Sequence, residues 1–236
     1  MGSSKADEKI LSYNDVVLRR SDLHILSGPY FLNDRVIEFY FSHLESTYPS
    51  NDILLLPPSI AFWIGRCPDK ESISCFVEPM KLGSKKLIIF PVNNNVDVTW
   101  AEGGSHWSLL AFDRNANIFV HHDSNGVTNS RHAKQLYQSV VDFVGCSGSK
   151  PKYVEHNRTP QQVNGYDCGL YVCAIARVIC SWYKSRGSKH DDNDNDKEDN
   201  LWFSTMEELI TPSAVAQLRS EILGLIQELI AAKQDA

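Results

Sequence analysis

Four side chains have the types and the spacing that cysteine-based acyl transfer would need, beginning with Cys168. In segment 161–183, QQVNGYDCGLYVCAIARVICSWY, a polar, turn-forming half passes into a long apolar run without proline. This pattern predicts a turn that leads into a buried helix at 167–169. The Cys168 thiol would then lie in the first helical turn, where unpaired backbone N–H groups and the helix dipole favour a thiolate. Cys168 is therefore the first candidate nucleophile.

A thiolate nucleophile also needs an imidazole that carries the proton, a group that fixes the imidazole tautomer, and donors for the oxyanion. His106 begins one strand-like run, and Asp123 follows a second run across a turn at 113–117. The hairpin that this pattern predicts brings both residues to the same open end of a sheet. Gln162 precedes Cys168 on a turn that must fold back over the helix N-terminus. Its amide could stand beside the Cys168 backbone N–H as an oxyanion donor.

Each of these residues is a weak signal when taken singly, because the chain has eight histidines and six cysteines. His122 is an alternative base beside Asp123, but the alternation of a strand points it to the opposite face. Cys173 and Cys180 lie in the apolar run and are expected in the core. Trp107 is either a core residue or a wall of a narrow substrate channel. The residues alone therefore leave the chemistry open.

The elements that would position these groups follow from apolar periodicity, capping residues and turn signals. Asn33 or Asp34 caps one helix, and Pro58 opens a short second one. Ser130 caps a third helix, and Pro212 opens a final amphipathic helix. The expected helices cover 34–44, 58–63, 130–144, 168–184 and 212–229, and the expected strands cover 86–92, 106–112, 118–122 and 152–155.

Length and composition indicate a globular protein with one domain, because 42% of the 236 residues are apolar and can form a real core. The net charge is −6, and segment 189–199 holds six acids against two lysines, so the rest of the chain is nearly balanced. That balance argues against nucleic acid as a partner.

No apolar stretch predicts a membrane span or a secretory signal, so a cytoplasmic or nuclear location is expected. No two cysteines stand as C-x-x-C, so neither a disulfide scaffold nor a zinc site is expected.

Four segments together carry a resemblance to a known family: FLNDRVIEFY (31–40), GSHWSLL (104–110), HHDS (121–124) and QQVNGYDCGLYVC (161–173). In this order they resemble the ubiquitin-like-protein-specific cysteine proteases, the desumoylases and deneddylases with the adenovirus-protease-like fold. The resemblance implies that Cys168 is the nucleophile, His106 the general base and acid, Asp123 its orienting partner, and Gln162 the oxyanion donor. It implies no metal and no cofactor.

Within that family the stretch AEGGSHWSLL and the paired glutamines before the cysteine turn look most like the deneddylase branch. That resemblance implies cleavage after the C-terminal Gly-Gly of the neddylation modifier, both in its precursor and in its conjugates with targets such as cullins. Trp107 and Phe31 would flank a tunnel for the Gly-Gly tail, and Asp34 would pair with a tail arginine. Phe31 departs from the tryptophan that is common in the family, which changes the shape of that wall.

The expected fold is α+β, with a mixed sheet of about five strands packed on the central Cys168 helix. We expect a flexible tail over 1–9, a catalytic domain over 10–184, an acidic insert over 185–203 and a C-terminal helical segment over 204–236. The protein is expected to be a monomer that binds a ubiquitin-like modifier and its conjugates. A desumoylase, an acyltransferase with the same triad and a non-catalytic module that binds ubiquitin-like proteins are the alternatives.

Overall fold

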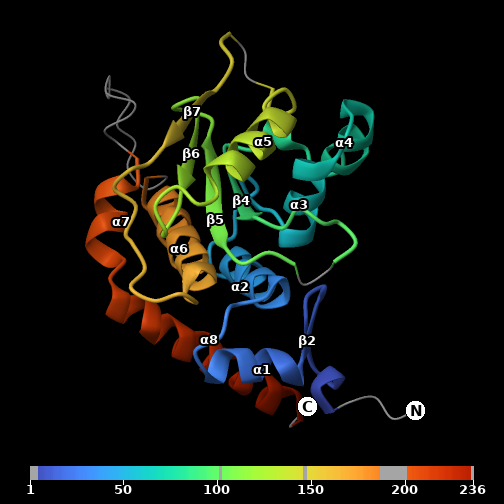
Figure 1. The fold of residues 1–236 in the computed structure, drawn as a ribbon, viewed down its shortest axis with the longest axis vertical. Helices are drawn as coiled ribbons and strands as arrows, with labels where there is room; N and C mark the ends of the chain where they lie inside the picture. The colour runs from blue at the N-terminus through green and yellow to red at the C-terminus, as the bar shows by residue number, and fades with distance from the viewer. Residues whose placement is uncertain (1–4, 101–102, 146–147, 187–200, 235–236) are drawn as a thin grey trace.

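A computed structural model describes residues 5–100, 103–145, 148–186 and 201–234, and within them the main sheet is mixed and five-stranded (Figure 1). Its outer pairs are parallel and its inner pairs antiparallel. The expected antiparallel hairpin of the strands predicted over 106–112 and 118–122 is confirmed. In spatial order the strands are β3 (Ile53–Leu55), β4 (Leu87–Asn93), β5 (Trp107–Asp113), β6 (Ile118–His122) and β7 (Lys152–Glu155).

The central strands are apolar on both faces, and their alternation divides the core into two layers. In β4, Leu87 and Ile89 pack into one layer, whereas Ile88 and Phe90 pack into the other. Both faces of the sheet therefore have to be covered by helices.

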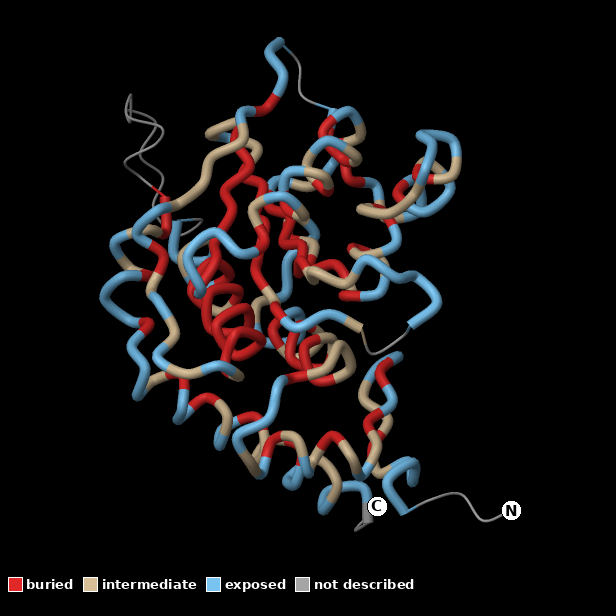
Figure 2. Tube along the Cα trace, viewed as in Figure 1, coloured by how far each residue is buried: buried red, intermediate tan, exposed pale blue. Residues whose placement is uncertain are grey.

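The first face packs against α6 (Cys168–Arg186), which in turn contacts α2 (Asp34–Thr47). Figure 2 shows α6 buried along most of its length. Its apolar residues face every direction, as expected for a helix enclosed by other elements. Cys173 and Cys180 are fully buried core residues, as predicted.

The second face packs against α3 (Pro58–Arg66) and α5 (Ser130–Val140), and α4 (Lys70–Val77) follows α3. The prediction that Ser130 caps α5 is wrong, because the residue at the cap position is Asn129 and its side chain makes no capping bond. Helix α5 also ends before the predicted boundary at 144. The short 3₁₀ helix Leu82–Ser84 leads into β4.

The N-terminal part of the chain is more ordered than predicted. After a 3₁₀ turn at Lys5–Asp7, β1 (Lys9–Tyr13) pairs with β2 (Val16–Arg19), and α1 (Arg20–Ser27) follows. Residues 5–9 of the expected tail therefore belong to the fold, and residues 1–4 lie outside the described residues. The long helix α8 (Pro212–Gln234) runs beside α1 and β1 (Figure 1).

The acidic insert was expected over 185–203, and the structure corrects both of its ends. The first two residues belong to α6, whereas Leu201 and Trp202 are buried in the main core before α7 (Phe203–Leu209). Residues 187–200 lie outside the described part of the chain. The C-terminal segment therefore consists of two helices. Among the described helices, none has the length and apolarity to span a membrane.

Candidate active site

Cys168 is the first residue of α6, and its thiol is free and fully buried. Gly169, the next residue, explains why α6 can begin so close to Leu32 in the loop before α2. A Cβ atom on Gly169 would lie 2.8 Å from the Cβ of Leu32, so only glycine permits this approach. The predicted junction of polar turn and buried helix is confirmed.

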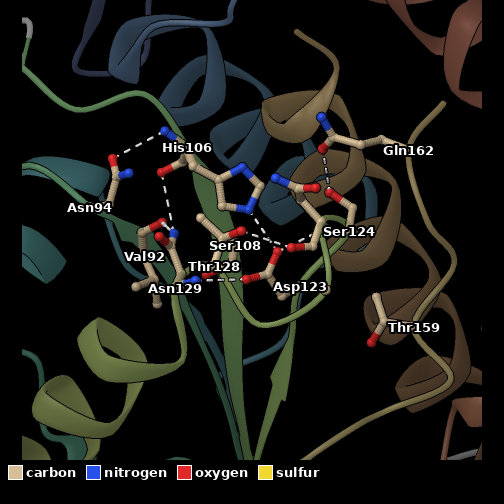
Figure 3. Close-up of polar contacts among 12 residues, drawn as sticks. Val92, Asn94, His106, Ser108, Asp123, Ser124, Thr128, Asn129, Thr159 and Gln162 are labelled. Carbon is tan, nitrogen blue, oxygen red and sulfur yellow. Dashed lines mark hydrogen bonds and ion pairs between the residues drawn. The ribbon is translucent and has the colours of Figure 1, made fainter. Parts of the chain in front are cut away.

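His106 and Asp123 meet at the open end of the β5–β6 hairpin (Figure 3). His106 precedes β5, Asp123 follows β6, and the register that pairs Leu109 with His122 brings them together. The His106 Nε2 atom lies 2.6 Å from Asp123 Oδ1, and both side chains are almost completely buried. In this arrangement the carboxylate fixes the imidazole ring and leaves Nδ1 for another partner.

Asn129 and Asn94 hold this pair in place, and sequence reasoning missed both of them. Asn129 donates its backbone N–H to Asp123 Oδ2 (2.8 Å) and its side-chain amide to the His106 carbonyl (3.2 Å). Asn94 Oδ1 accepts the backbone N–H of His106 (3.1 Å; Figure 3). Because one buried residue, Asn129, contacts both members, it holds them together in addition to their own hydrogen bond.

The protonation of His106 is set by opposing effects. Burial alone would lower its pKa, but the hydrogen bonds with Asp123 and with the Cys168 thiol outweigh burial and raise the pKa to about 9. For Asp123, burial acts to raise the pKa, and the hydrogen bonds from His106 and the backbone reverse this and lower it. An ionised carboxylate therefore faces an imidazolium that contacts the thiol, which is the charge arrangement that favours a thiolate.

We predict that the stability of the folded protein falls as the pH rises through the pKa of His106. Because this pKa is about 9 in the folded state, above the ordinary value near 6.5, the folded state holds the proton more tightly. The stabilisation is complete below about pH 6.5 and is lost as the pH rises through 9. Thermal denaturation from pH 6.5 to 10 should show a steeper loss of Tm for the native chain than for His106→Gln. Equal slopes would contradict the prediction.

His122, the alternative base, is occupied elsewhere. Its Nδ1 pairs with the Thr159 hydroxyl (3.1 Å), and its Nε2 accepts the indole N–H of Trp202 (2.9 Å). Burial, followed by the neighbouring His156 and His121, keeps its pKa well below the usual value. His122 is therefore neutral, and it accepts a hydrogen bond at Nε2 instead of contacting the thiol.

Gln162 lies where the turn folds back over the start of α6, because Tyr171 Oη donates to the Gln161 carbonyl (3.0 Å). The Ser124 hydroxyl donates to Gln162 Oε1 (2.8 Å; Figure 3), and Gln162 Nε2 donates to the Asn164 carbonyl (2.7 Å). These two bonds fix which end of the amide carries the nitrogen, and they leave one N–H of Nε2 for another acceptor. The role of Gln162 as an oxyanion donor stays a prediction.

A pocket of about 680 Å³ opens beside His106. Phe31, Asp34 and Trp107, the three residues predicted to bind substrate, all line it. The Trp107 indole N–H donates to the Leu32 carbonyl (3.0 Å). The Trp107 side of the pocket is therefore tied to the loop that carries Phe31. Cys168 does not line the pocket itself, but His106 does and contacts its thiol.

The double glycine before His106 also belongs to this pocket, and its conformation requires glycine. Gly104 has a φ of +86°, and a Cβ atom there would lie 2.0 Å from the side-chain oxygen of Asn93. Asp34 also lines the pocket, and its Oδ1 accepts the backbone N–H of Arg35 (3.0 Å). The pocket therefore combines aromatic walls, a tight backbone loop and a carboxylate.

The sequence of residues 30–211 matches the Ulp1 protease family, C-terminal catalytic domain, over well more than half of the chain. The chain belongs to the Ulp1 protease family. It is a cysteine protease, and the mixed sheet with its buried cysteine helix is the Ulp1-like protease fold. The resemblance stated from the four sequence segments is confirmed.

Two similar proteins match nearly the whole chain. NEDD8-specific protease 1 of Arabidopsis thaliana is 53% identical over 230 residues, covering 98% of this chain and 97% of that protein. Human Sentrin-specific protease 8 is 32% identical over 226 residues, covering 94% and 98%. Among solved structures, the C-terminal Ulp1 protease domain in complex with Smt3, the yeast ortholog of SUMO, has a TM-score of 0.68 at 18% identity, covering 96% of this chain and 90% of that one.

Proposed function

We propose that this Ulp1-family protease cleaves after the C-terminal Gly-Gly of the neddylation modifier, in its precursor and in its conjugates. The observation that carries the proposal is the buried His106–Asp123 pair in contact with the Cys168 thiol, beside a pocket with aromatic walls. The choice of modifier draws on the 53% identity with a protein named NEDD8-specific protease 1.

In the proposed reaction, Cys168 and His106 act as a thiolate–imidazolium pair. The Cys168 sulfur attacks the carbonyl carbon of the modifier's last glycine, and the Gln162 amide and the Cys168 backbone N–H stabilise the oxyanion. His106 gives its proton to the leaving amine as the C–N bond breaks, which leaves a thioester. Water then attacks the thioester with His106 as base, and the modifier leaves as a carboxylate while the thiol is restored.

The pocket supports a substrate that ends in glycines. Phe31 and Trp107 both line it, and a tail threaded between these two aromatic side chains would have room for backbone but not for larger side chains. Asp34 lies on the same pocket and would pair with an arginine of the modifier's tail. Binding energy from these groups would position the glycine carbonyl for attack.

The proposal is tested with three modifiers that carry an electrophile in place of the last glycine: the neddylation modifier, SUMO and ubiquitin. We expect the neddylation modifier to label Cys168 fastest, with the site identified by peptide mass spectrometry and Cys168→Ala as the unlabelled control. Faster labelling by SUMO would make the protein a desumoylase instead. Labelling by none of the three would favour the acyltransferase or the non-catalytic module.

A further inference from the structure

Arg219, in the first half of α8, joins three segments that are far apart in the sequence. Its guanidinium donates to the carbonyls of Ile25 and Tyr30 and to the carboxylate of Asp167, each at 2.9 Å. The ion pair with Asp167 is largely buried, with side chains 12% and 10% exposed. The Tyr166 ring also lies under the guanidinium, with 5.7 Å to its centroid. A C-terminal helix thus contacts the residue immediately before the candidate nucleophile.

One branch of this contact leads to the candidate oxyanion donor. Asn164 Nδ2 donates to Asp167 Oδ2 (2.7 Å), and Asn164 Oδ1 accepts the backbone N–H groups of Tyr166 and Asp167. The Asn164 carbonyl in turn accepts the Gln162 amide (2.7 Å). A continuous hydrogen-bonded path therefore runs from Arg219 through Asp167 and Asn164 to Gln162.

The other branch leads to the pocket. Tyr30, whose carbonyl accepts from Arg219, directly precedes Phe31 in the pocket wall. The same loop continues to Leu32, whose carbonyl accepts the indole N–H of Trp107. Arg219 therefore contacts the turn on one side of Cys168 and the loop that forms the pocket on the other.

We propose that Arg219 is a positioning residue. It fixes the turn that carries Gln162 (residues 161–167) and the loop that carries Phe31 (residues 28–33) relative to each other. The inference rests on the proposed function, because it concerns how Gln162 and the pocket act on one substrate. Arginine suits this position because its planar guanidinium group donates to several acceptors in fixed directions. Lysine offers a point charge and could satisfy Asp167 without holding both carbonyls.

The first test compares Arg219→Met with Arg177→Met on a fluorogenic neddylation-modifier substrate. Arg177 is the matched control because it forms another ion pair with α8, to Glu221 (2.9 Å), without contacting the turn or the loop. We expect Arg219→Met to lower kcat about 10-fold or more and to raise KM, since small displacements of catalytic groups are costly. Arg177→Met should stay within about twofold of the native enzyme, and Arg219→Lys should not restore kcat.

The second test separates positioning from a general loss of structure. If Arg219 acts on kcat through Gln162, then Arg219→Met should lower kcat by less than about twofold once Gln162→Ala is present. Its effect on KM, which arises in the other branch, should persist in the double variant. An undiminished loss of kcat in the Gln162→Ala background would overturn the inference, as would native kinetics for Arg219→Met or Arg219→Lys.

A third measurement needs no activity. Hydrogen exchange followed by mass spectrometry should show faster exchange of peptides covering 161–167 and 28–33 in Arg219→Met, but not in Arg177→Met. Unchanged exchange in both segments would overturn the role of Arg219. A native enzyme that cleaves none of the three modifiers would instead overturn the proposed function, so the two failures are distinguishable.

Discussion

Cys168→Ala is expected to abolish cleavage of a fluorogenic neddylation-modifier substrate while leaving affinity for the modifier largely intact. Loss of a catalytic nucleophile lowers kcat by on the order of 10⁶-fold in comparable enzymes. Binding should survive because the pocket residues Phe31, Asp34 and Trp107 do not depend on the thiol. Rates measured at saturating substrate and affinity measured by calorimetry separate the two effects.

The matched control for this prediction is Cys180→Ala, which removes a thiol from the same helix. Cys180 is fully buried, and burial raises its pKa to about 12, so it stays a neutral thiol. The control variant should lose some stability through the cavity it leaves, with a native rate per folded molecule. Unchanged hydrolysis by Cys168→Ala would remove Cys168 from the mechanism.

His106→Ala is expected to be nearly as damaging, because the imidazole contacts the thiol and, in the proposed reaction, carries the proton to the leaving amine. In comparable enzymes, loss of the histidine costs about as much as loss of the nucleophile. The variant should also react more slowly with iodoacetamide near neutral pH, since the imidazolium no longer stabilises the thiolate. Single-turnover cleavage and alkylation rates, measured side by side, test both parts.

Two comparisons make the result specific to His106. His43→Ala removes a histidine on α2 that bonds only to Thr47 among the described side chains, and it should leave both rates unchanged. Asp123→Ala should lose activity by releasing the imidazole from its 2.6 Å hydrogen bond. Full activity of either His106→Ala or Asp123→Ala would reopen the choice of catalytic residues.

Local patterns in the sequence were enough to find the helix that begins at Cys168 and the hairpin that brings His106 and Asp123 together. Cys168 stands at an abrupt change from polar turn to apolar run, and His106 and Asp123 bracket two strands joined by a short turn. Such signals depend on neighbouring residues, so periodicity and turn chemistry can detect them.

The supporting contacts could not be predicted in this way, because they join distant parts of the chain. Arg219 lies 52 residues after Asp167 and 189 residues after Tyr30, and nothing near it in sequence distinguishes it from an exposed helical arginine. Asn129 looks like a loop residue before a better cap, Ser130, yet it bonds to two carbonyls in the buried interior. Trp202 follows an acidic stretch and belongs to an apolar run too short to reveal a period.

The hydrogen bond from the Trp107 indole to the Leu32 carbonyl has a consequence for the thermodynamics of recognition. Together with the close approach at Gly169, it ties Trp107 to the loop that carries Phe31 when the chain folds, before any ligand arrives. The ordering cost of these two walls is then met in folding, which lowers the conformational entropy lost on association. Such a preorganised opening selects chain ends that are already extended, and it disfavours a terminus that must first unfold.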